Sequence, residues 1–554
     1  MSVIHRKKTK SMFPYKNLFA AILLGCLTVP AFAQKELEGD NVTVIKDFDA
    51  RLLESNKLSV PPSLPPLDTN TQLQNYVVPP RPLTVQYDAP KLRPIGMKAG
   101  AKEEAYNGFA KAGAGAPKTF WGEFGYYFAA KEKFDGKVWF RHHSLDASKN
   151  IDNQRFSNND FLLNGNYYIN EQIAAEAKVA VSADRFHFYG YPHDSLHEYS
   201  RDRTLQKFNL VNVGGRVYNK ERNSNDLNFS VAPQFYVLND YYSNKESGFD
   251  LNMSATKWFA EKHALRLAIR TDMTKFHDTL TQRLNNIYLQ PSFTFHSDIV
   301  KIKVGGNFAS NRDVFSIFPD AELALRVFGD GIQIFAGANG DLRKNTYRTL
   351  SDYSPFVQIR ETKLKNTRFD NYYAGVKGNL GWLDYSGQVN YSKASDLALF
   401  QTQYTSEDIT RFHVMYDTVK ISNIQGTIKF SPLKDLVLTG TLSQNFIMDP
   451  VREFKAWGLP KLEGNFGAVY TALDGKAILK GNLYTADGIW FLDSEGTARR
   501  SEVLLDLNVG GSYYFSKNIG AFLDINNILN NRRERWRDYP TVGLNFLAGI
   551  TARF

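Results

Sequence analysis

Few residues in this chain have the type and spacing that a catalytic or metal-binding site needs. His142 and His143 with Asp146 form the densest group of ionisable side chains. Neighbouring residues of a strand point to opposite faces, so the two histidines cannot bind one metal ion from a regular strand. The chain contains neither an HExxH nor a GxSxG motif. The residue types therefore indicate neither an enzyme nor a metal or other cofactor.

A basic run near the C-terminus is the strongest concentration of charge, and its members are Arg532, Arg533, Arg535, Trp536 and Arg537. Guanidinium groups bind phosphates and carboxylates through paired hydrogen bonds. One interpretation is an outer loop that contacts lipopolysaccharide phosphates or an anionic ligand. The other is a solvated loop in which Glu534 and Asp538 neutralise the arginines, and the presence of these acids favours it.

The last stretch, residues 541–554, follows the basic run directly and is expected to be a strand that holds the run in place. Its sequence, TVGLNFLAGITARF, alternates with a period of two. One face is almost wholly apolar and the other is mostly small or polar, as in a strand with lipid outside and water inside. This face is expected to drive membrane insertion of the C-terminal strand, and its main residues are Val542, Leu544, Phe546, Ile550 and Phe554.

The same alternation recurs from about residue 105 onward, with connections that are alternately short and long. Long polar connections are expected at 187–203, 343–366, 395–411 and 530–540. Counting the hairpins predicts an all-β fold, a transmembrane antiparallel β-barrel of about 22 strands with both ends in the periplasm. Pro291 predicts an irregularity within its strand, and a break in the alternation near Asn423 and Ile424 predicts a β-bulge.

The N-terminal segment is typical of an exported protein. Residues 1–33 are expected to be a signal peptide, with a basic start, an apolar run at 18–29 and cleavage after Ala33. The alternative is a lipoprotein signal in which Cys26 is lipidated. Cys26 is the one cysteine of the chain, so cleavage after Ala33 would exclude disulfides.

Residues 34–104 are expected to form a short, proline-rich, extended periplasmic leader before the barrel at 105–554. Many of the 21 prolines lie between Pro61 and Pro94, where they favour polyproline II over sheet. The leader is either disordered or a strap that docks on a partner. Its candidate docking residues are Val42, Val44 and Ile45.

The composition agrees with an exported barrel. Aromatic residues make up 14% of the chain, with 40 Phe and 29 Tyr. The formal net charge of +10 comes to a large extent from the basic start of the signal peptide. The remaining bases are spread among acids, which excludes the clustered basic patch of a nucleic-acid-binding protein.

The C-terminal region resembles the closing hairpin of TonB-dependent outer-membrane receptors, most closely those of Bacteroidetes-type bacteria. The resemblance rests on DINNILNN at 524–531, Arg535-Trp536, Tyr539-Pro540 and Gly543. It implies the family's barrel, an outer-membrane location in a Gram-negative cell and a role in solute transport. It covers residues 105–554.

The chain departs from this family before the barrel. Family members carry a globular plug domain there, whereas residues 34–104 are short and rich in proline. We therefore expect no plug, and the family's coupling to TonB is not carried over. Without a plug, the lumen must be filled by the leader, infolded loops, lumenal side chains or a partner.

The sequence thus predicts an outer-membrane channel or uptake component for an unidentified solute. The alternative is a non-transporting scaffold or assembly component whose leader docks periplasmic or membrane partners. In either case the expected partners are outer-membrane lipids and lipopolysaccharide, with a possible periplasmic or outer-membrane protein.

Overall fold

The computed structural model describes residues 106–554, apart from 131–132, 195–196, 312–313, 361, 405–407, 449 and 454. The described chain forms one antiparallel barrel of 22 strands, as the sequence predicts. The predictions for the signal peptide, Cys26, the leader and the docking residues Val42, Val44 and Ile45 lie outside the described residues.

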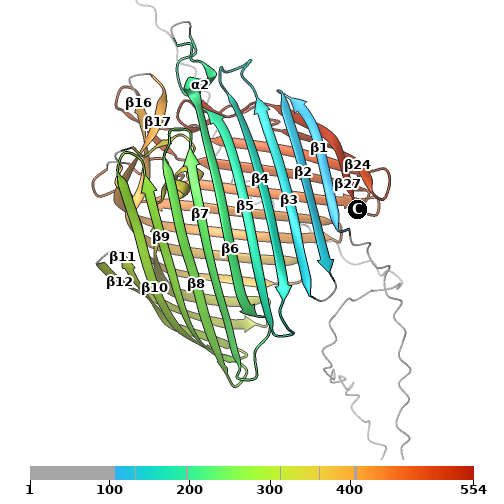
Figure 1. Cartoon of the computed structure of the whole chain (residues 1–554), viewed down its shortest axis with the longest axis vertical. Helices are drawn as coiled ribbons and strands as arrows, with labels where there is room; N and C mark the ends of the chain where they lie inside the picture. The colour runs from blue at the N-terminus through green and yellow to red at the C-terminus, as the bar shows by residue number, and fades with distance from the viewer. Residues whose placement is uncertain are drawn as a thin grey trace, which may run out of the picture. The chain divides into compact units, whose positions relative to one another are not determined.

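Each strand of the barrel pairs with the next one along the chain, and the first pairs with the last (Figure 1). The first half comprises β1 (Gly108–Ala116), β2 (Thr119–Ala130), β3 (Phe134–Asp146), β4 (Arg155–Tyr168), β5 (Ile173–His187), β6 (Leu205–Asn219), β7 (Leu227–Asp240), β8 (Lys245–Phe259), β9 (His263–His277), β10 (Thr281–His296) and β11 (Val300–Asn311). The second half comprises β12 (Val314–Phe328), β13 (Ile332–Lys344), β15 (Asn366–Asn379), β16 (Leu383–Tyr404), β17 (Thr410–Leu433), β18 (Leu436–Ile447), β19 (Leu462–Ala472), β20 (Ala477–Asp487), β23 (Leu504–Tyr514), β24 (Ile519–Asn526) and β27 (Asn545–Arg553).

Short elements occupy the connections between these strands. They are α2 (Arg201–Thr204), α3 (Tyr347–Tyr353), β14 (Val357–Gln358), the pair β21 (Trp490–Leu492) and β22 (Ala498–Arg500), and the pair β25 (Glu534–Trp536) and β26 (Tyr539–Pro540). Among the described residues, no helix has the length and apolar character needed to cross a bilayer.

The barrel closes through the ladder between β1 and β27. This ladder runs from the pair Phe109 and Arg553 to the pair Ala116 and Phe546. Beyond it, the amide of Gly108 donates to the carbonyl of Phe554 at 2.8 Å, and the amide of Phe554 donates back at 2.9 Å. Closure leaves no free sheet edge between the first strand and the last, which a wall surrounded by lipid requires.

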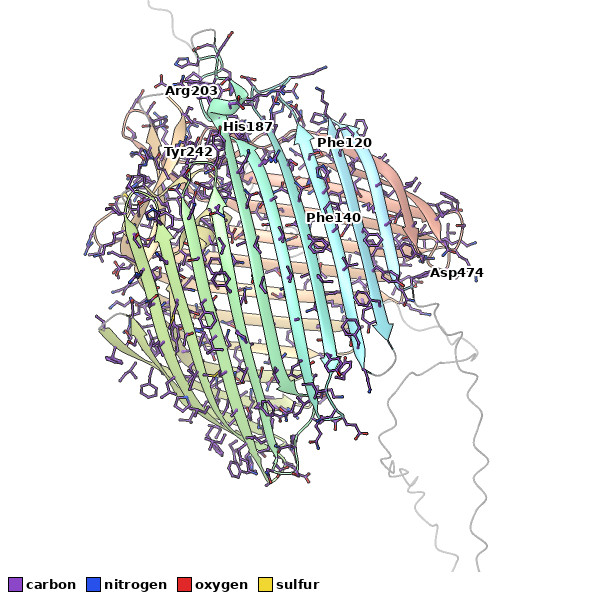
Figure 2. All side chains as sticks on the ribbon, in the orientation of Figure 1. Phe120, Phe140, His187, Arg203, Tyr242 and Asp474 are labelled. Carbon is purple, nitrogen blue, oxygen red and sulfur yellow. The ribbon has the colours of Figure 1, made fainter. Side chains whose placement is uncertain are left out.

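The strands present apolar side chains to the outside of the barrel. Figure 2 shows Phe120 of β2 and Phe140 of β3 on this outer surface, where they are 58% and 41% exposed. In the last stretch the exposed apolar residues are Leu544, Phe546, Ile550 and Phe554. Val542, expected on the same face, instead lies before β27 and lines an internal cavity, because β27 begins only at Asn545.

The connections separate into two classes at the two ends of the barrel. At one end, which also carries both barrel termini, they are short turns, the longest being 220–226. At the other end the longest connections are 188–204, 345–365, 448–461, 488–503 and 527–544. In outer-membrane barrels the short turns face the periplasm and the long loops face outward, so the second end is the outer mouth.

The predicted long loop at 395–411 is wrong. Strands β16 and β17 continue through most of it, and only residues 405–409 connect them. The extension is a two-stranded hairpin in which Leu399 and Phe400 are both buried, although they point to opposite faces. Outside the membrane both faces pack on protein, so the alternation that identified the other strands is lost.

The two predicted irregularities have different outcomes. Pro291 does interrupt its sheet, because the ladder between β10 and β11 skips from Leu289 to Ser292 without a change of register. The predicted bulge near Asn423 and Ile424 is wrong, since both ladders of β17 are continuous there. The alternation changes in the sequence because two inward residues just outside the membrane, Val419 and Ile421, pack on loop residues around Trp457.

The lipid-facing alternation predicts a position-specific cost for a charged residue. Val213 of β6 is 46% exposed on the outer face, and its neighbour Asn212 faces the lumen. V213R should lower the free energy of unfolding by about 2–4 kcal/mol, because the guanidinium must enter the bilayer. N212R should change it by much less. Urea unfolding in lipid vesicles, followed by tryptophan fluorescence, measures both, and equal losses would contradict the assigned faces.

Candidate functional site: the loop layer at the outer mouth

The connection between β13 and β15, residues 345–365, folds into the barrel interior instead of standing outside it. Gln282 of β10 holds its returning limb, accepting from the amide of Leu364 at 2.9 Å and donating to the carbonyl of Thr362 at 2.9 Å. Its middle part, β14, pairs in parallel with β17 through Val357 and Phe412. The connection is therefore attached to distant parts of the wall.

A buried carboxylate fixes helix α3 of this connection. Glu246 of β8 is only 1% exposed and accepts hydrogen bonds from the amides of Tyr347 at 2.6 Å and Arg348 at 3.3 Å. Its other donor is the Tyr236 hydroxyl, at 3.0 Å. The first amides of a helix lack partners within the helix and carry partial positive charge, so an anion is stabilised there. A capping box at Thr346 defines the start of α3.

An aromatic cluster joins this connection to the other outer loops. Phe356 stacks on Tyr539 with ring centroids 3.6 Å apart and an angle of 17° between the planes. Trp536 lies 4.9 Å from Phe412 and 5.6 Å from Tyr353, centroid to centroid. We call this cluster the loop layer, and its buried aromatic members are Phe188, Tyr191, Phe208, Phe276, Tyr347, Phe356, Phe400, Phe412, Trp536 and Tyr539.

The loop layer combines residues from four connections and from the inner faces of several strands. Tyr539 joins β26 to β17, since its hydroxyl donates to the carbonyl of Thr410 at 2.7 Å. Burial raises the pKa of this phenol well above its usual value, so it remains a neutral donor. Burial of aromatic rings contributes both apolar area and specific ring–ring contacts. The layer is thus a packed structure at the outer mouth of the barrel.

The structure distributes the basic run among separate partners. Arg533 pairs with Glu502, and Arg537 pairs with Glu534 at 3.1 Å and with Asp538 at 3.0 Å. The pairs of Arg537 agree with the interpretation of the run as a solvated loop with its own acids, whereas Arg533 pairs with an acid from the connection between β20 and β23. Trp536, in contrast, is a buried member of the loop layer.

Arg535 differs from Arg533 and Arg537 because it donates hydrogen bonds to neutral groups. It donates to the carbonyl of Gly458 at 3.2 Å and to the hydroxyl of Tyr353 at 2.8 Å. It also lies over the ring of Trp536 at 4.8 Å. Its role in the structure is to attach β25 to α3 and to the loop at 448–461.

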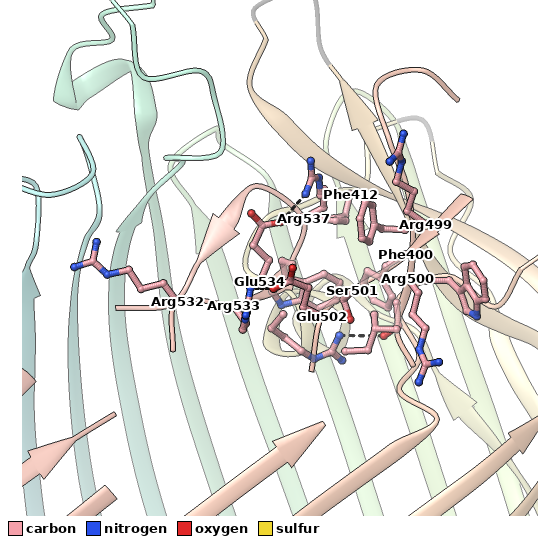
Figure 3. Close-up of a pocket in the computed structure, with 16 residues that line it drawn as sticks. Phe400, Phe412, Arg499, Arg500, Ser501, Glu502, Arg532, Arg533, Glu534 and Arg537 are labelled. Atoms are coloured by element: carbon pink, nitrogen blue, oxygen red, sulfur yellow. Dashed lines mark hydrogen bonds and ion pairs between the residues drawn. The ribbon is translucent and has the colours of Figure 1, made fainter. Parts of the chain in front are cut away.

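An outer cavity of about 350 Å³ lies beside the basic run. It is lined by aromatic rings, by the arginines and by two acids, Glu502 and Glu534. Figure 3 shows that the arginine side chains diverge, with Arg532 directed away from the others and Arg499 and Arg500 pointing in different directions. The geometry therefore does not bring the predicted ligand residues Arg532, Arg533, Arg535 and Arg537 to one anion.

A second cavity, of about 430 Å³, lies between the loop at 345–365 and the wall formed by β4–β7. Its lining includes apolar rings from Phe156, Phe186, Phe208 and Phe356. It also includes the charged side chains Asp184, Arg155, Arg348 and Asp352. Apolar walls with a few charged groups are typical of small-molecule sites.

A histidine bridge joins two outer connections. His197 in the β5–β6 connection lies 2.6 Å from Asp194 through Nδ1 and 3.1 Å from Asp408 through Nε2. The hydrogen bonds to Asp194 and then Asp408 raise the pKa of His197 above its usual value, since both carboxylates favour the protonated ring. His197 and Asp194 lie in the same connection, whereas Asp408 belongs to the connection between β16 and β17. Among the described residues, no three histidine, cysteine or acidic side chains are arranged so that they could hold a metal ion.

The sequence reasoning missed the residues that build the loop layer. The stretch at 343–366 was expected to be a polar outer loop, yet it contains Tyr347, Leu350, Phe356, Val357 and Ile359, all buried. These apolar residues within an outer loop were the available signal. Glu246 gave no signal, because a single acid in a strand has no distinguishing pattern.

Comparisons with known proteins show which solved barrels have a similar fold. No protein-family model matches the chain, and no curated protein matches it. Solved structures do. The pyoverdine outer-membrane receptor of Pseudomonas aeruginosa has a TM-score of 0.61 at 10% identity, covering 82% of this chain and 79% of the receptor.

Two further receptors show the same similarity. The siderophore receptor of Acinetobacter baumannii has a TM-score of 0.60 at 9% identity, covering 81% of this chain and 80% of that one. The alcaligin outer-membrane receptor of Bordetella pertussis has a TM-score of 0.53 at 11% identity, covering 81% and 76%. The protein therefore has the barrel fold of TonB-dependent siderophore receptors, and the solved receptors with this fold are outer-membrane proteins.

Replacement of Glu246 by glutamine should loosen α3 without leaving an empty space where the side chain was. E246Q keeps the shape of the side chain but removes the charge that the helix amides contact. Hydrogen bonds to charged groups contribute about 1.5–3 kcal/mol, so amide exchange in residues 347–350 should accelerate roughly tenfold or more. Hydrogen exchange with mass spectrometry on peptides from 345–365 measures this. The control is E322Q, which removes a carboxylate paired with Lys301 on the wall, and equal effects of the two variants would contradict the anchor.

Proposed function

We propose that this protein is an outer-membrane uptake channel whose outer mouth is gated by the loop layer. The observation that carries the proposal is the connection at 345–365, which crosses the interior of the barrel and is fixed there by Glu246 and by the Phe356–Tyr539 stack. A barrel of 22 strands is too wide for wall side chains to fill, so another element must restrict passage. The loop layer is such an element.

The cavities beside the loop layer support capture of a solute at this level. The inner one, of about 430 Å³, has the size of a small-molecule site and combines apolar rings with a few charged groups. The similar solved structures are receptors for iron-carrying siderophores, which supports uptake as the general function. No feature of the described residues favours the alternative of a non-transporting scaffold.

Energy coupling is not part of this proposal. The residues expected to dock in the periplasm, Val42, Val44 and Ile45, lie outside the described residues, and so does the proline-rich leader. Contact of the outer loops with lipopolysaccharide remains a prediction for the exposed arginines Arg532 and Arg533.

Single-channel conductance in planar bilayers tests the proposal. The full chain should show low conductance, because the loop layer restricts the mouth. The F356A/Y539A double variant removes the stacked pair and should increase either the conductance or the frequency of open events severalfold. F120A is the matched control, since Phe120 is an aromatic residue on the lipid-facing surface.

A third variant, which lacks residues 35–100, separates the leader from the loop layer. If deletion of the leader opens the channel and F356A/Y539A does not, the leader is the gate and the loop layer is not. If the double variant and the deletion both stay closed, the channel proposal is overturned.

A further inference from the structure

The barrel wall is incomplete in the outer part of the junction between β12 and β13. The ladder between these strands runs from the pair Phe328 and Ile332 only as far as the pair Asp320 and Asn339. Strand β12 continues to Val314 with β11 as its partner, and β13 continues with β15 as its partner. Residues 314–319 of β12 and 340–344 of β13 are thus adjacent in the order of the barrel but do not pair.

Strand β13 turns into the lumen at this point. Its Leu342 is buried in a cluster with Tyr288, Ala309 and Phe318, which lie on the inner face of β10, β11 and β12. The carbonyl of Gly340 accepts from the Asn307 side chain at 2.9 Å. The carbonyl of Leu342 accepts from the Tyr288 hydroxyl at 3.1 Å. Side chains of β10 and β11 therefore replace hydrogen bonds that β13 does not make with β12. We call this overlapping, unpaired region, residues 314–319 of β12 and 340–344 of β13, the lapped seam.

The β12 side of the seam is an open strand edge. The amide of Arg326 donates to Ile299 on the β11 side, so even-numbered residues of β12 face β11 and odd-numbered ones face the seam. The ladder stops next to Pro319, which has no N–H to donate. Proline in a sheet usually occupies such an unpaired edge position. Figure 1 shows the β11–β12 hairpin ending short of β9 and β10.

The open edge lies beside apolar side chains of the outer surface. Phe315 and Ile317 point outward and are 80% and 66% exposed. The outward residues continue as an apolar row through Leu323 and Leu325 towards the periplasmic end. Unpaired backbone groups in hydrocarbon cost several kcal/mol each, so a seam at this depth is a feature that needs an explanation.

We propose that this lapped seam is a lateral portal between the lumen and the outer leaflet, and that the transported solute is an amphiphile with an acyl chain. The proposal rests on the uptake function proposed above and names its substrate class. The outer side of the seam carries Phe315 and Ile317, and its inner side carries the Ala309–Phe318–Leu342 cluster beside the buried amide of Asn307. An acyl chain that crosses the seam would therefore contact mainly apolar side chains. Arg368 lies 4.4 Å over the ring of Phe318 and pairs with Asp370 at 3.0 Å, which places a charged pair at the seam for a polar headgroup.

Cysteine accessibility from the lipid phase tests the portal. Ala309 is fully buried in the seam cluster, and Ala324 is 2% exposed on the inner face of β12 where the ladder to β13 is intact. A309C and A324C are matched small substitutions, made in the full chain with Cys26 replaced by serine. Each variant is reconstituted in phosphatidylcholine vesicles and reacted with dodecyl maleimide or with a charged, water-soluble maleimide.

The portal predicts that dodecyl maleimide modifies A309C at least tenfold faster than A324C, and that lauric acid in the vesicles slows this reaction. Equal rates for the two variants would overturn the proposal. Faster modification of A309C by the charged reagent alone would also overturn it, since the seam would then open only to water. Protection of A309C at high protein density would assign the open edge to pairing between two copies and contradict the portal.

The conductance test is independent of these rates. A channel that conducts while its A309C and A324C variants react equally leaves the uptake function standing and removes only the lateral route. Thermal unfolding on gels confirms that both cysteine variants are folded before the comparison.

Discussion

Backbone hydrogen bonding within lipid is the constraint on which the rest of this structure depends. No water is present in the hydrocarbon to satisfy a free amide or carbonyl, so a sheet that crosses the membrane must close on itself. The ladder between β1 and β27 provides that closure. Closure of 22 strands creates a wide interior, and the wide interior in turn requires an element to fill its mouth.

The chain meets this second requirement with polar and aromatic contacts that lie at the outer end of the wall. One buried carboxylate, Glu246, holds the start of α3, and a stack of Phe356 on Tyr539 holds the later part of the same connection. These two attachments come from distant parts of the sequence, β8 and β26. The loop layer therefore depends on long-range contacts that the closed barrel brings together.

Much of the wall could be predicted from the sequence because lipid and water impose a period of two on every strand. Residues 544–554 are an example, and the structure confirms the number of strands. The prediction failed where this contrast disappears. The β16–β17 hairpin beyond the membrane packs on protein on both faces, and Val419 and Ile421 pack inward on loop residues, so their patterns indicated a loop and a bulge that do not exist.

The site was less predictable than the wall, for a physical reason. The basic run at Arg532–Arg537 drew attention because charge is visible in a sequence, yet its arginines are neutralised by nearby acids or directed apart. The residues that build the loop layer are distant in sequence and meet only after the barrel closes. The lapped seam between β12 and β13 gave one local sign, Pro319, but an isolated proline does not show where a neighbouring strand leaves the sheet.

The central claim is that the connection at 345–365 is held inside the mouth in a single position. The most direct measurement is the distance distribution between spin labels at Asp352, on α3, and at Lys149, on the connection between β3 and β4, recorded by double electron–electron resonance in outer-membrane vesicles. Both side chains are exposed, so labelling leaves the packing intact. The account predicts one narrow distribution, which broadens in the E246Q background. A broad distribution in the unaltered chain would show that the connection is not fixed across the mouth and would contradict the account.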